Sequence, residues 1–162
     1  MPTSHEPADY ACPFCAVVTT RENGVNNVDD VVLRRPEALA LIAPRWWPNN
    51  HGHVLVITTG HYENLYGLPS AAGHAVHDMV KDVAIAIRHT YGCEGVSTRQ
   101  HNEPAGYQDV WHYHVHVFPR YPGDDLYRSR LSPGYIAPND RKPFADKLRA
   151  YFAAAPSRAN GH

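Results

Sequence analysis

The segment VWHYHVHVF, residues 110–118, places histidines at positions 112, 114 and 116, with apolar or aromatic residues between them. Successive side chains of a β-strand point to opposite faces of the sheet, so residues two apart share a face. The alternation therefore predicts a strand with His112, His114 and His116 on one face. The intervening residues are expected to be buried, which leaves a face lined by imidazoles.

The spacing of these histidines limits what they can do together. Two residues of strand cover about 6.5 Å, so His112 and His116 are expected to lie about 13 Å apart. Zinc–nitrogen bonds are about 2.0–2.1 Å long, so neighbours in the row can share one ion but all three cannot. A solvated strand face and a metallohydrolase that uses the row as ligands are two alternatives. Neutral histidine is also a nucleophile toward phosphorus, and flanking imidazoles and amides can hold phosphate oxygens.

Four further segments are predicted to be strands because they are short and rich in apolar or β-branched residues. They are residues 31–35 and 39–43, which form a hairpin, 53–59 and 95–100. The residues rich in Pro, Gly and Asn at 45–52, and those rich in Pro, Gly, Asp and Arg at 121–140, predict loops.

Two helices are also predicted. Apolar residues repeat at helical spacing between Ser70, a candidate N-cap, and Gly92, which ends the helix. A last helix is expected over 143–155, with Pro143 in its first turn. The fold class is therefore α+β: an antiparallel β-sheet of about five strands with a long central helix and a C-terminal helix. The expected organisation is a single domain over residues 1–162.

The composition narrows the class of protein. The 162 residues are 43% hydrophobic and 19% charged, with a net charge of −1 when histidine is neutral. A core can be buried, and no broad attraction to nucleic acid or membranes is expected. No stretch approaches the roughly 20 apolar residues of a membrane span, and the N-terminal MPTSHEPADY does not resemble a signal peptide. We expect a cytoplasmic protein.

Two of the three cysteines, Cys12 and Cys15, form a Cys-x-x-Cys pair, while Cys93 is expected to be packed at a helix end. Without a secretion signal, such a pair indicates a metal or redox motif rather than a structural disulfide. A redox motif of the thioredoxin type follows a strand, and no strand-like run precedes CPFC. A tetrahedral zinc site needs four ligands, of which the pair supplies two.

The segment HYHVHVF resembles the signature of the histidine triad (HIT) nucleotide-binding family: His, apolar, His, apolar, His, then two apolar residues. CPFC, GHVLVITTGHYENL (52–65) and HNEPAGYQDVWHYHVHVFPR (101–120) are similar to further segments of that family, in its order and close to its spacing. The resemblance covers roughly residues 10 to 122, and the remaining C-terminal residues add little to it. Members of the family are usually homodimers, so the resemblance implies one here.

The resemblance to zinc-bearing bacterial members implies a zinc site. The implied ligands are Cys12, Cys15, His61 and His112. Two thiolates and two imidazoles leave no open position on zinc, so the metal is expected to be structural. The alternatives are cysteines that are reduced and metal-free, and His51 or His53 as rival ligands.

The resemblance also implies a reaction. His114, the middle histidine, would attack the α-phosphate of a nucleotide and form a covalent nucleotidyl-histidine, which water then hydrolyses. His116 would bind the phosphate, and Asn102 and Gln108 would contact phosphate or ribose. Nucleoside phosphoramidates and dinucleoside polyphosphates are the implied substrates, and both hydrolysis and nucleotidyl transfer stay open. A non-catalytic nucleotide-binding or regulatory module is the alternative class.

Two positions depart from the family pattern. Asp109 stands where members often carry Ser or Thr, three residues before the triad. A carboxylate there repels a phosphate unless it is protonated or turned toward a cation, so Asp109 is expected either to act on the leaving group of the substrate or to make a different interaction. Arg45 stands eight residues before His53, where members commonly carry an Asp for the ribose. The adjacent Trp46 and Trp47 are candidates for stacking on a base, or for a place in the core or a dimer interface.

Overall fold

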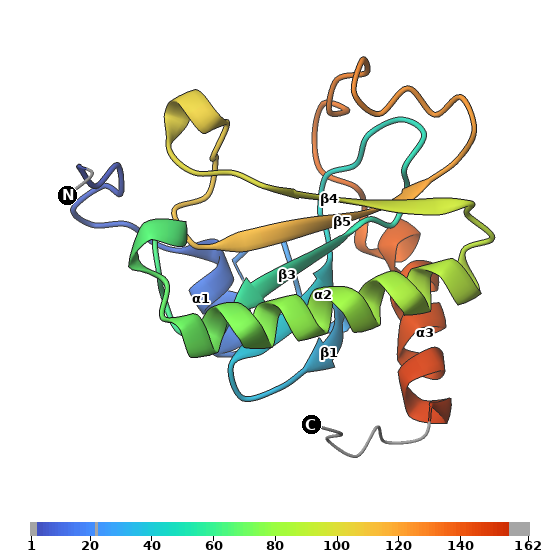
Figure 1. Ribbon diagram of the computed structural model, residues 1–162, viewed down its shortest axis with the longest axis horizontal. Helices are drawn as coiled ribbons and strands as arrows, with labels where there is room; N and C mark the ends of the chain where they lie inside the picture. Colours follow the sequence, from blue (N-terminus) through green and yellow to red (C-terminus); the bar gives the residue numbers. More distant parts are fainter. Residues whose placement is uncertain (1–2, 22, 156–162) are drawn as a thin grey trace.

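Five strands form one antiparallel sheet in the computed structural model, which describes residues 3–21 and 23–155 (Figure 1). They are β1 Val31–Arg34, β2 Ala38–Ile42, β3 Val54–Thr58, β4 Gly95–Gln100 and β5 His114–Arg120. The order across the sheet is β1-β2-β3-β5-β4, so β5 lies between β3 and β4. The α+β fold class predicted from the sequence is confirmed.

The long helix α2, Ser70–Thr90, lies across one face of the sheet (Figure 1). Its apolar stripe is buried there, including Val76, Met79 and Val83. Gly92 follows the helix at φ +67°, a backbone conformation that glycine adopts without strain, so its role as a stop signal is confirmed. The predicted cap is wrong: Ser70 is already helical, and the extended residue before the helix is Pro69, which has no capping side chain.

The structure also contains a short helix that the sequence reading missed, α1, Pro13–Val18. Cys12 is its N-cap residue, and its Sγ accepts a hydrogen bond of 3.4 Å from the amide of Cys15. Three single-turn 3₁₀ helices complete the inventory of helices in residues 3–21 and 23–155: η1 Val28–Asp30, η2 Leu65–Gly67 and η3 Pro104–Gly106. None of the helices in this part of the chain has the length and apolar character needed to cross a membrane.

The C-terminal helix α3 spans Pro138–Ala154, so it begins five residues before the predicted start. Pro138 occupies the first helical turn, where a missing N–H costs nothing, while Pro143 lies inside the helix. A buried ion pair helps to hold the first turn of α3, which begins at Pro138, in place. The Arg141 guanidinium binds both carboxylate oxygens of Asp30 at 2.8 and 2.9 Å, which fixes α3 to η1.

The histidine-rich segment does not form one continuous strand. Strand β5 begins at His114, and the residues before it follow an irregular path in which the amide of Tyr113 bonds to the carbonyl of Tyr62. His112 leaves the strand pattern because its Nε2 donates to the backbone carbonyl of Thr58 at 2.9 Å. The prediction that all three histidines share one strand is therefore wrong for His112.

The register of the sheet places His116 between two different neighbours. Leu55 of β3 is its partner on one side, and Arg99 of β4 is its partner on the other. Side chains that are directly opposite on paired strands lie on the same face. The face opposite α2 therefore carries an apolar, an imidazole and a guanidinium group in one row.

Candidate functional site

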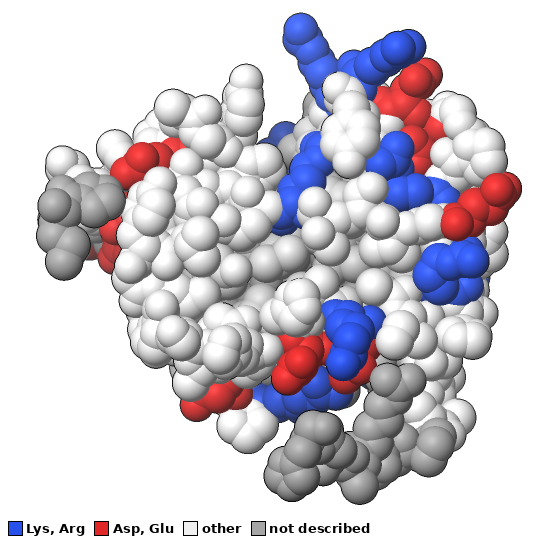
Figure 2. Space-filling view, in the orientation of Figure 1, with Lys and Arg blue, Asp and Glu red and all other residues white. Residues whose placement is uncertain are grey.

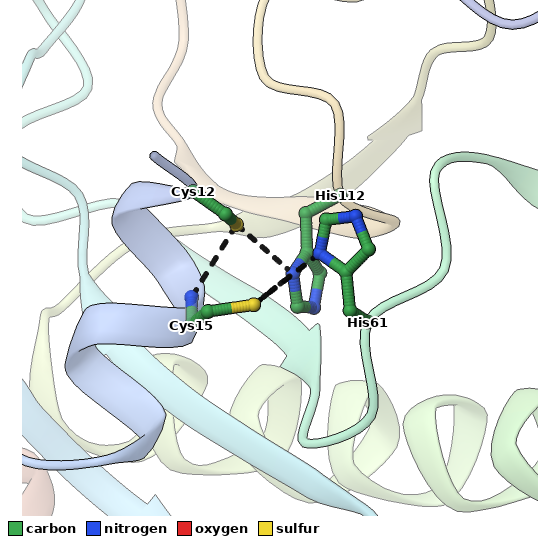
Figure 3. A group of neighbouring side chains, drawn as sticks. All are labelled: Cys12, Cys15, His61 and His112. Atoms are coloured by element: carbon green, nitrogen blue, oxygen red, sulfur yellow. Dashed lines mark hydrogen bonds between the residues drawn. The ribbon is translucent and has the colours of Figure 1, made fainter. Parts of the chain in front are cut away.

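The four predicted metal ligands come from separate parts of the chain and meet at one end of the sheet. Cys12 and Cys15 lie at the start of α1, His61 follows β3 and His112 precedes β5 (Figure 3). One sulfur or ring nitrogen of each lies within 4.8 Å of those of the other three. The shortest separations join Cys12 Sγ to His112 Nδ1 and Cys15 Sγ to His61 Nδ1, both 3.3 Å, and Cys15 Sγ lies 3.7 Å from His112 Nδ1.

These separations fit a tetrahedral zinc site. Zinc bonds of about 2.3 Å to sulfur and 2.05 Å to nitrogen put the two donor atoms about 3.6 Å apart at the tetrahedral angle. The opposite ring nitrogens are held by acceptors: His112 Nε2 lies 2.9 Å from the carbonyl of Thr58, and His61 Nε2 lies 2.7 Å from the carboxylate of Glu6. Each acceptor keeps a hydrogen on Nε2 and leaves the lone pair on Nδ1, the arrangement that second-sphere partners of zinc impose.

The protonation of these groups also bears on the metal. Burial lowers the pKa of His112 to about 4, so its ring is neutral and able to act as a ligand. Burial and the adjacent Cys12 raise the pKa of the Cys15 thiol to about 12. A divalent cation reverses that effect, since a coordinating thiol is deprotonated. The four residues therefore match zinc in donor type, spacing and hydrogen bonding.

His114 is the first residue of β5, and the residue is 3% exposed. Its Nδ1 donates to the backbone carbonyl of His112 at 2.7 Å, which fixes the tautomer and leaves the Nε2 lone pair free. Burial lowers the pKa of His114, and the His112 carbonyl and the Asp109 carboxylate oppose that effect. The imidazole is thus held neutral, in one orientation.

His116 lies beside His114, with 5.1 Å between their ring centroids. Its Nδ1 lies 3.3 Å from Nε2 of the buried His53, and its ring stacks on Phe118. Burial lowers the pKa of His116 well below its ordinary value, and the neighbouring histidines and Arg99 act in the same direction. This ring is therefore also neutral.

Both histidines line a cavity of about 1000 Å³, at the upper end of the range for small-molecule sites. Its floor is the sheet face that carries His114 and His116, and Phe14 of α1 contributes one wall. Residues of the segment that follows β5 contribute another wall, in the part of the molecule where Lys and Arg side chains gather (Figure 2). The cavity lies beside the cysteine–histidine cluster, which does not line it.

The HIT domain model matches residues 25–123, more than half of the chain. The chain belongs to the HIT family.

Two relatives and two solved structures illustrate this membership. The HIT protein is 36% identical to Protein hit of Bacillus subtilis over 46% of its own length and 51% of the relative's. It is 32% identical to adenylylsulfatase HINT3 of Arabidopsis thaliana over 51% of its length and 42% of that protein's. The HIT protein thus spans about half the length of these two curated relatives.

The solved structures extend the likeness to nearly the whole fold. A Hit-like protein of Bartonella henselae involved in cell-cycle regulation has a TM-score of 0.73 and 25% identity, covering 90% of this HIT protein and 98% of that chain. A zinc-bound histidine triad family protein of Mycobacterium smegmatis has a TM-score of 0.71 and 27% identity, covering 88% and 94%. A zinc-bound relative accords with the Cys₂His₂ cluster of this HIT protein.

Three predicted substrate contacts differ in where the HIT fold places them. Asp109 lines the cavity, near His114. Asn102 and Gln108 are not among the lining residues. The Asn102 amide bonds to Gln100 and to the amide of Leu65, and Gln108 bonds to backbone groups around the β4–β5 loop. Both side chains order that loop, and their contact with a substrate stays a prediction.

The two tryptophans of the HIT protein have separate places. Trp46 is 4% exposed, donates from Nε1 to the carbonyl of Ala43 and packs against Phe144, so it belongs to the core. Trp47 lines the cavity, as does Arg45. Of the pair, only Trp47 is placed to contact a ligand in this cavity.

The sequence reading missed part of the cavity. Arg99 reaches it from β4, and the segment after β5 supplies residues beyond the end of the HIT match at 123, including Tyr127, Ser129 and Arg130. That segment is bonded to the β2–β3 loop through the amides of Ser132 and Ile136, which donate to the carbonyls of Trp46 and Pro44. The basic residues of LYRSR (126–130) are visible in the sequence. Nothing in the sequence alone indicates that this segment lies against the cavity.

Proposed function

We propose that this HIT protein is an enzyme that attacks the α-phosphate of a nucleotide derivative and releases the nucleoside monophosphate. Nε2 of His114 forms a bond to the α-phosphorus while the bond from phosphorus to the leaving group breaks, and the leaving group departs with that electron pair. Water then attacks the phosphorus and frees the histidine. Overall one water is consumed: its oxygen stays on the phosphate and one of its protons ends on the leaving group.

The observation that carries the proposal is the hydrogen bond between His114 and the carbonyl of His112. It fixes Nδ1 as the protonated nitrogen and leaves Nε2 as the nucleophile. A neutral, buried imidazole needs no deprotonation before it attacks. His116 and the buried His53 behind it line the same cavity, where we assign His116 to contact the phosphate oxygens.

Cys12, Cys15, His61 and His112 would hold a zinc ion in this proposal. When bound, zinc has four protein ligands and no open position, so it stabilises the fold around α1 and the start of β5. His112 would connect the two sites, since its ring faces the cysteines and its carbonyl faces His114. No chemical step is assigned to the metal.

Asp109 has a different proposed part. It lines the cavity and its negative charge acts on the ring of His114. Such a charge favours the positive ring of the nucleotidyl-histidine over free, neutral histidine. We therefore assign Asp109 to the covalent intermediate and the leaving-group side, and Asn102 and Gln108 to the ordering of the loop that carries it.

The proposal includes a homodimer in the cytoplasm, built from one domain per chain, as the family resemblance implies. Light scattering after gel filtration tests the dimer. A single monomeric species at micromolar concentration contradicts it.

Trapping of the covalent intermediate tests the enzyme. Wild-type protein is mixed with adenosine 5′-phosphoramidate or diadenosine tetraphosphate, quenched in alkali within seconds and digested for mass spectrometry. We expect an adenylyl group on the peptide that contains His114, and none in His114→Asn. His77→Asn is the matched control, because His77 is exposed on α2 and away from the cavity. Tight binding with neither adduct nor turnover would favour the non-catalytic nucleotide-binding module.

A further inference from the structure

Arg99 lies beside the third histidine of the triad. The two residues are register partners on β4 and β5, and both side chains line the cavity. Directly opposite residues have Cβ atoms about 4.5–5.5 Å apart. The other register partner of His116 is the apolar Leu55 on β3. Of the two partners, only Arg99 on β4 brings a positive charge next to His116.

Among the residues that the structure describes, no carboxylate forms an ion pair with this arginine. Within residues 3–21 and 23–155, the ion pairs of Arg120 with Asp124 and Arg141 with Asp30 have no counterpart at Arg99. Its guanidinium lies instead over three aromatic rings, 4.7 Å from Tyr127, 5.2 Å from Phe118 and 5.5 Å from Trp47. One long hydrogen bond of 3.4 Å reaches a backbone carbonyl. Aromatic faces hold a guanidinium in place without using its N–H donors, which stay available to an anion.

The same cavity has other polar atoms without partners. Among the described residues, four buried side-chain atoms lack a hydrogen bond, and three of them belong to cavity residues: Arg45 Nε, His53 Nδ1 and Ser129 Oγ. Buried polar groups are rarely left unpaired, so such a concentration indicates a place where a ligand completes the bonding. The carboxylate of Asp109, which lines the cavity, acts on His114, whereas the ionisable neighbours that act on Arg99 are the phenol of Tyr127 and the guanidinium of Arg120.

We propose that Arg99 is a specificity-determining residue that binds a negatively charged leaving group, the phosphate next to the one attacked by His114. The preferred substrates are then nucleotides whose α-phosphate carries a phosphate chain, rather than those that carry a neutral amine. This inference rests on the proposed function. In this arrangement His114 and His116 on β5 contact the α-phosphate. The guanidinium of Arg99, on the adjacent strand β4, contacts the next phosphate of the chain.

Steady-state rates on two substrates test the selectivity. Wild type, Arg99→Met and Arg99→Lys are compared on diadenosine tetraphosphate and adenosine 5′-phosphoramidate. Methionine keeps an unbranched apolar stem among the aromatic rings but removes the charge. We expect Arg99→Met to lower kcat/KM for the tetraphosphate about tenfold or more, and for the phosphoramidate less than about threefold. Arg99→Lys should fall between. Equal losses of kcat/KM on both substrates would indicate a structural role for Arg99 and overturn the inference. Unchanged kcat/KM on both substrates would overturn it as well.

A binding measurement separates this inference from the proposed function. In the His114→Asn background, calorimetry gives the dissociation constants of AMP and adenosine 5′-tetraphosphate with and without Arg99→Met. We expect the tetraphosphate to bind about tenfold more weakly without Arg99 and AMP to change less than about threefold. Arg35→Met is the control, since Arg35 pairs with Asp82 away from the cavity. Absence of turnover in wild type would refute the proposed function alone, and an unchanged ratio of the two constants would refute the role of Arg99.

Discussion

The backbone carbonyl of His112 and Nδ1 of His114 are joined by a hydrogen bond of 2.7 Å. The ring of His112 faces the cysteine pair, so one residue contacts both the predicted zinc site and the proposed nucleophile. A shift of the metal ligand His112 therefore moves the carbonyl group that orients the ring of His114.

Loss of the cysteine pair is expected to remove zinc and to destabilise the protein. Two imidazoles alone bind zinc far more weakly than the full set, and the metal's binding energy contributes to folding. We expect the Cys12→Ser/Cys15→Ser variant to contain less than one tenth of the wild-type zinc by elemental analysis, with a lower thermal unfolding midpoint. Cys93→Ala is the control, because Cys93 is a buried thiol outside the cluster. One zinc per chain in the double variant would refute the assignment.

Glu6 is expected to tune the metal through His61. Its carboxylate lies 2.7 Å from His61 Nε2 and keeps the opposite nitrogen oriented toward Cys15. We expect Glu6→Gln to weaken zinc binding about tenfold, measured by competition with a chromophoric chelator. Glu63→Gln is the matched change, since Glu63 binds Ser4 and His5 in the same N-terminal segment. Equal affinity in both variants would show that Glu6 has no influence on the site.

The buried ion pair between Arg141 and Asp30 is expected to stabilise the fold far more than the exposed pair between Lys142 and Asp146 on α3. Arg141 is 1% exposed and Asp30 3%, so removal of one partner leaves a buried charge unpaired. We expect Arg141→Met to lower the free energy of unfolding by about 3–5 kcal/mol in urea titrations. Lys142→Met removes the exposed pair with Asp146 and should leave the free energy of unfolding close to the wild-type value, because solvent screens that pair. Similar effects of the two substitutions would contradict this account.

His53 is expected to make the fold sensitive to acid. Complete burial, assisted by Arg99, lowers its pKa from 6.5 to about 3. The unfolded chain therefore takes up this proton at a higher pH than the folded chain does. The stability associated with neutral His53 is complete above pH 6.5 and is lost as the pH falls from there toward 3. Its nearest titratable and charged neighbours, His116 and Arg99, disfavour a positive His53 in the folded state.

We expect His53→Phe to flatten the pH dependence of the unfolding free energy between pH 6.5 and 4, by a few kcal/mol over that window. Phenylalanine is chosen because His53 already stacks on Phe118. Chemical denaturation at half-unit steps of pH measures the difference between variant and wild type. Parallel curves would show that His53 does not contribute.

The sequence was sufficient to predict the sheet and the long helix, because short apolar or β-branched runs and helical spacing are local signals. The Cys-x-x-Cys pair indicated a metal or redox motif, whereas His61 and His112 followed from the resemblance to the HIT family, and the structure brings all four residues together. His112 was misplaced because its bond to Thr58 is a tertiary contact that local alternation does not encode. Arg99 was missed for a similar reason. Its place beside His116 depends on the register between β4 and β5, which the sequence of either strand alone does not encode.

The cavity wall formed by the segment after β5 has a consequence for how this chain can change. The proposed nucleophile lies within the HIT match, which ends at residue 123, whereas Tyr127, Ser129 and Arg130 lie beyond it. Part of the cavity wall thus comes from a stretch of polypeptide that follows the one carrying the proposed nucleophile and Arg99. Exchange of residues 126–135 between family members is therefore expected to reshape that wall while His114, His116 and Arg99 stay in place.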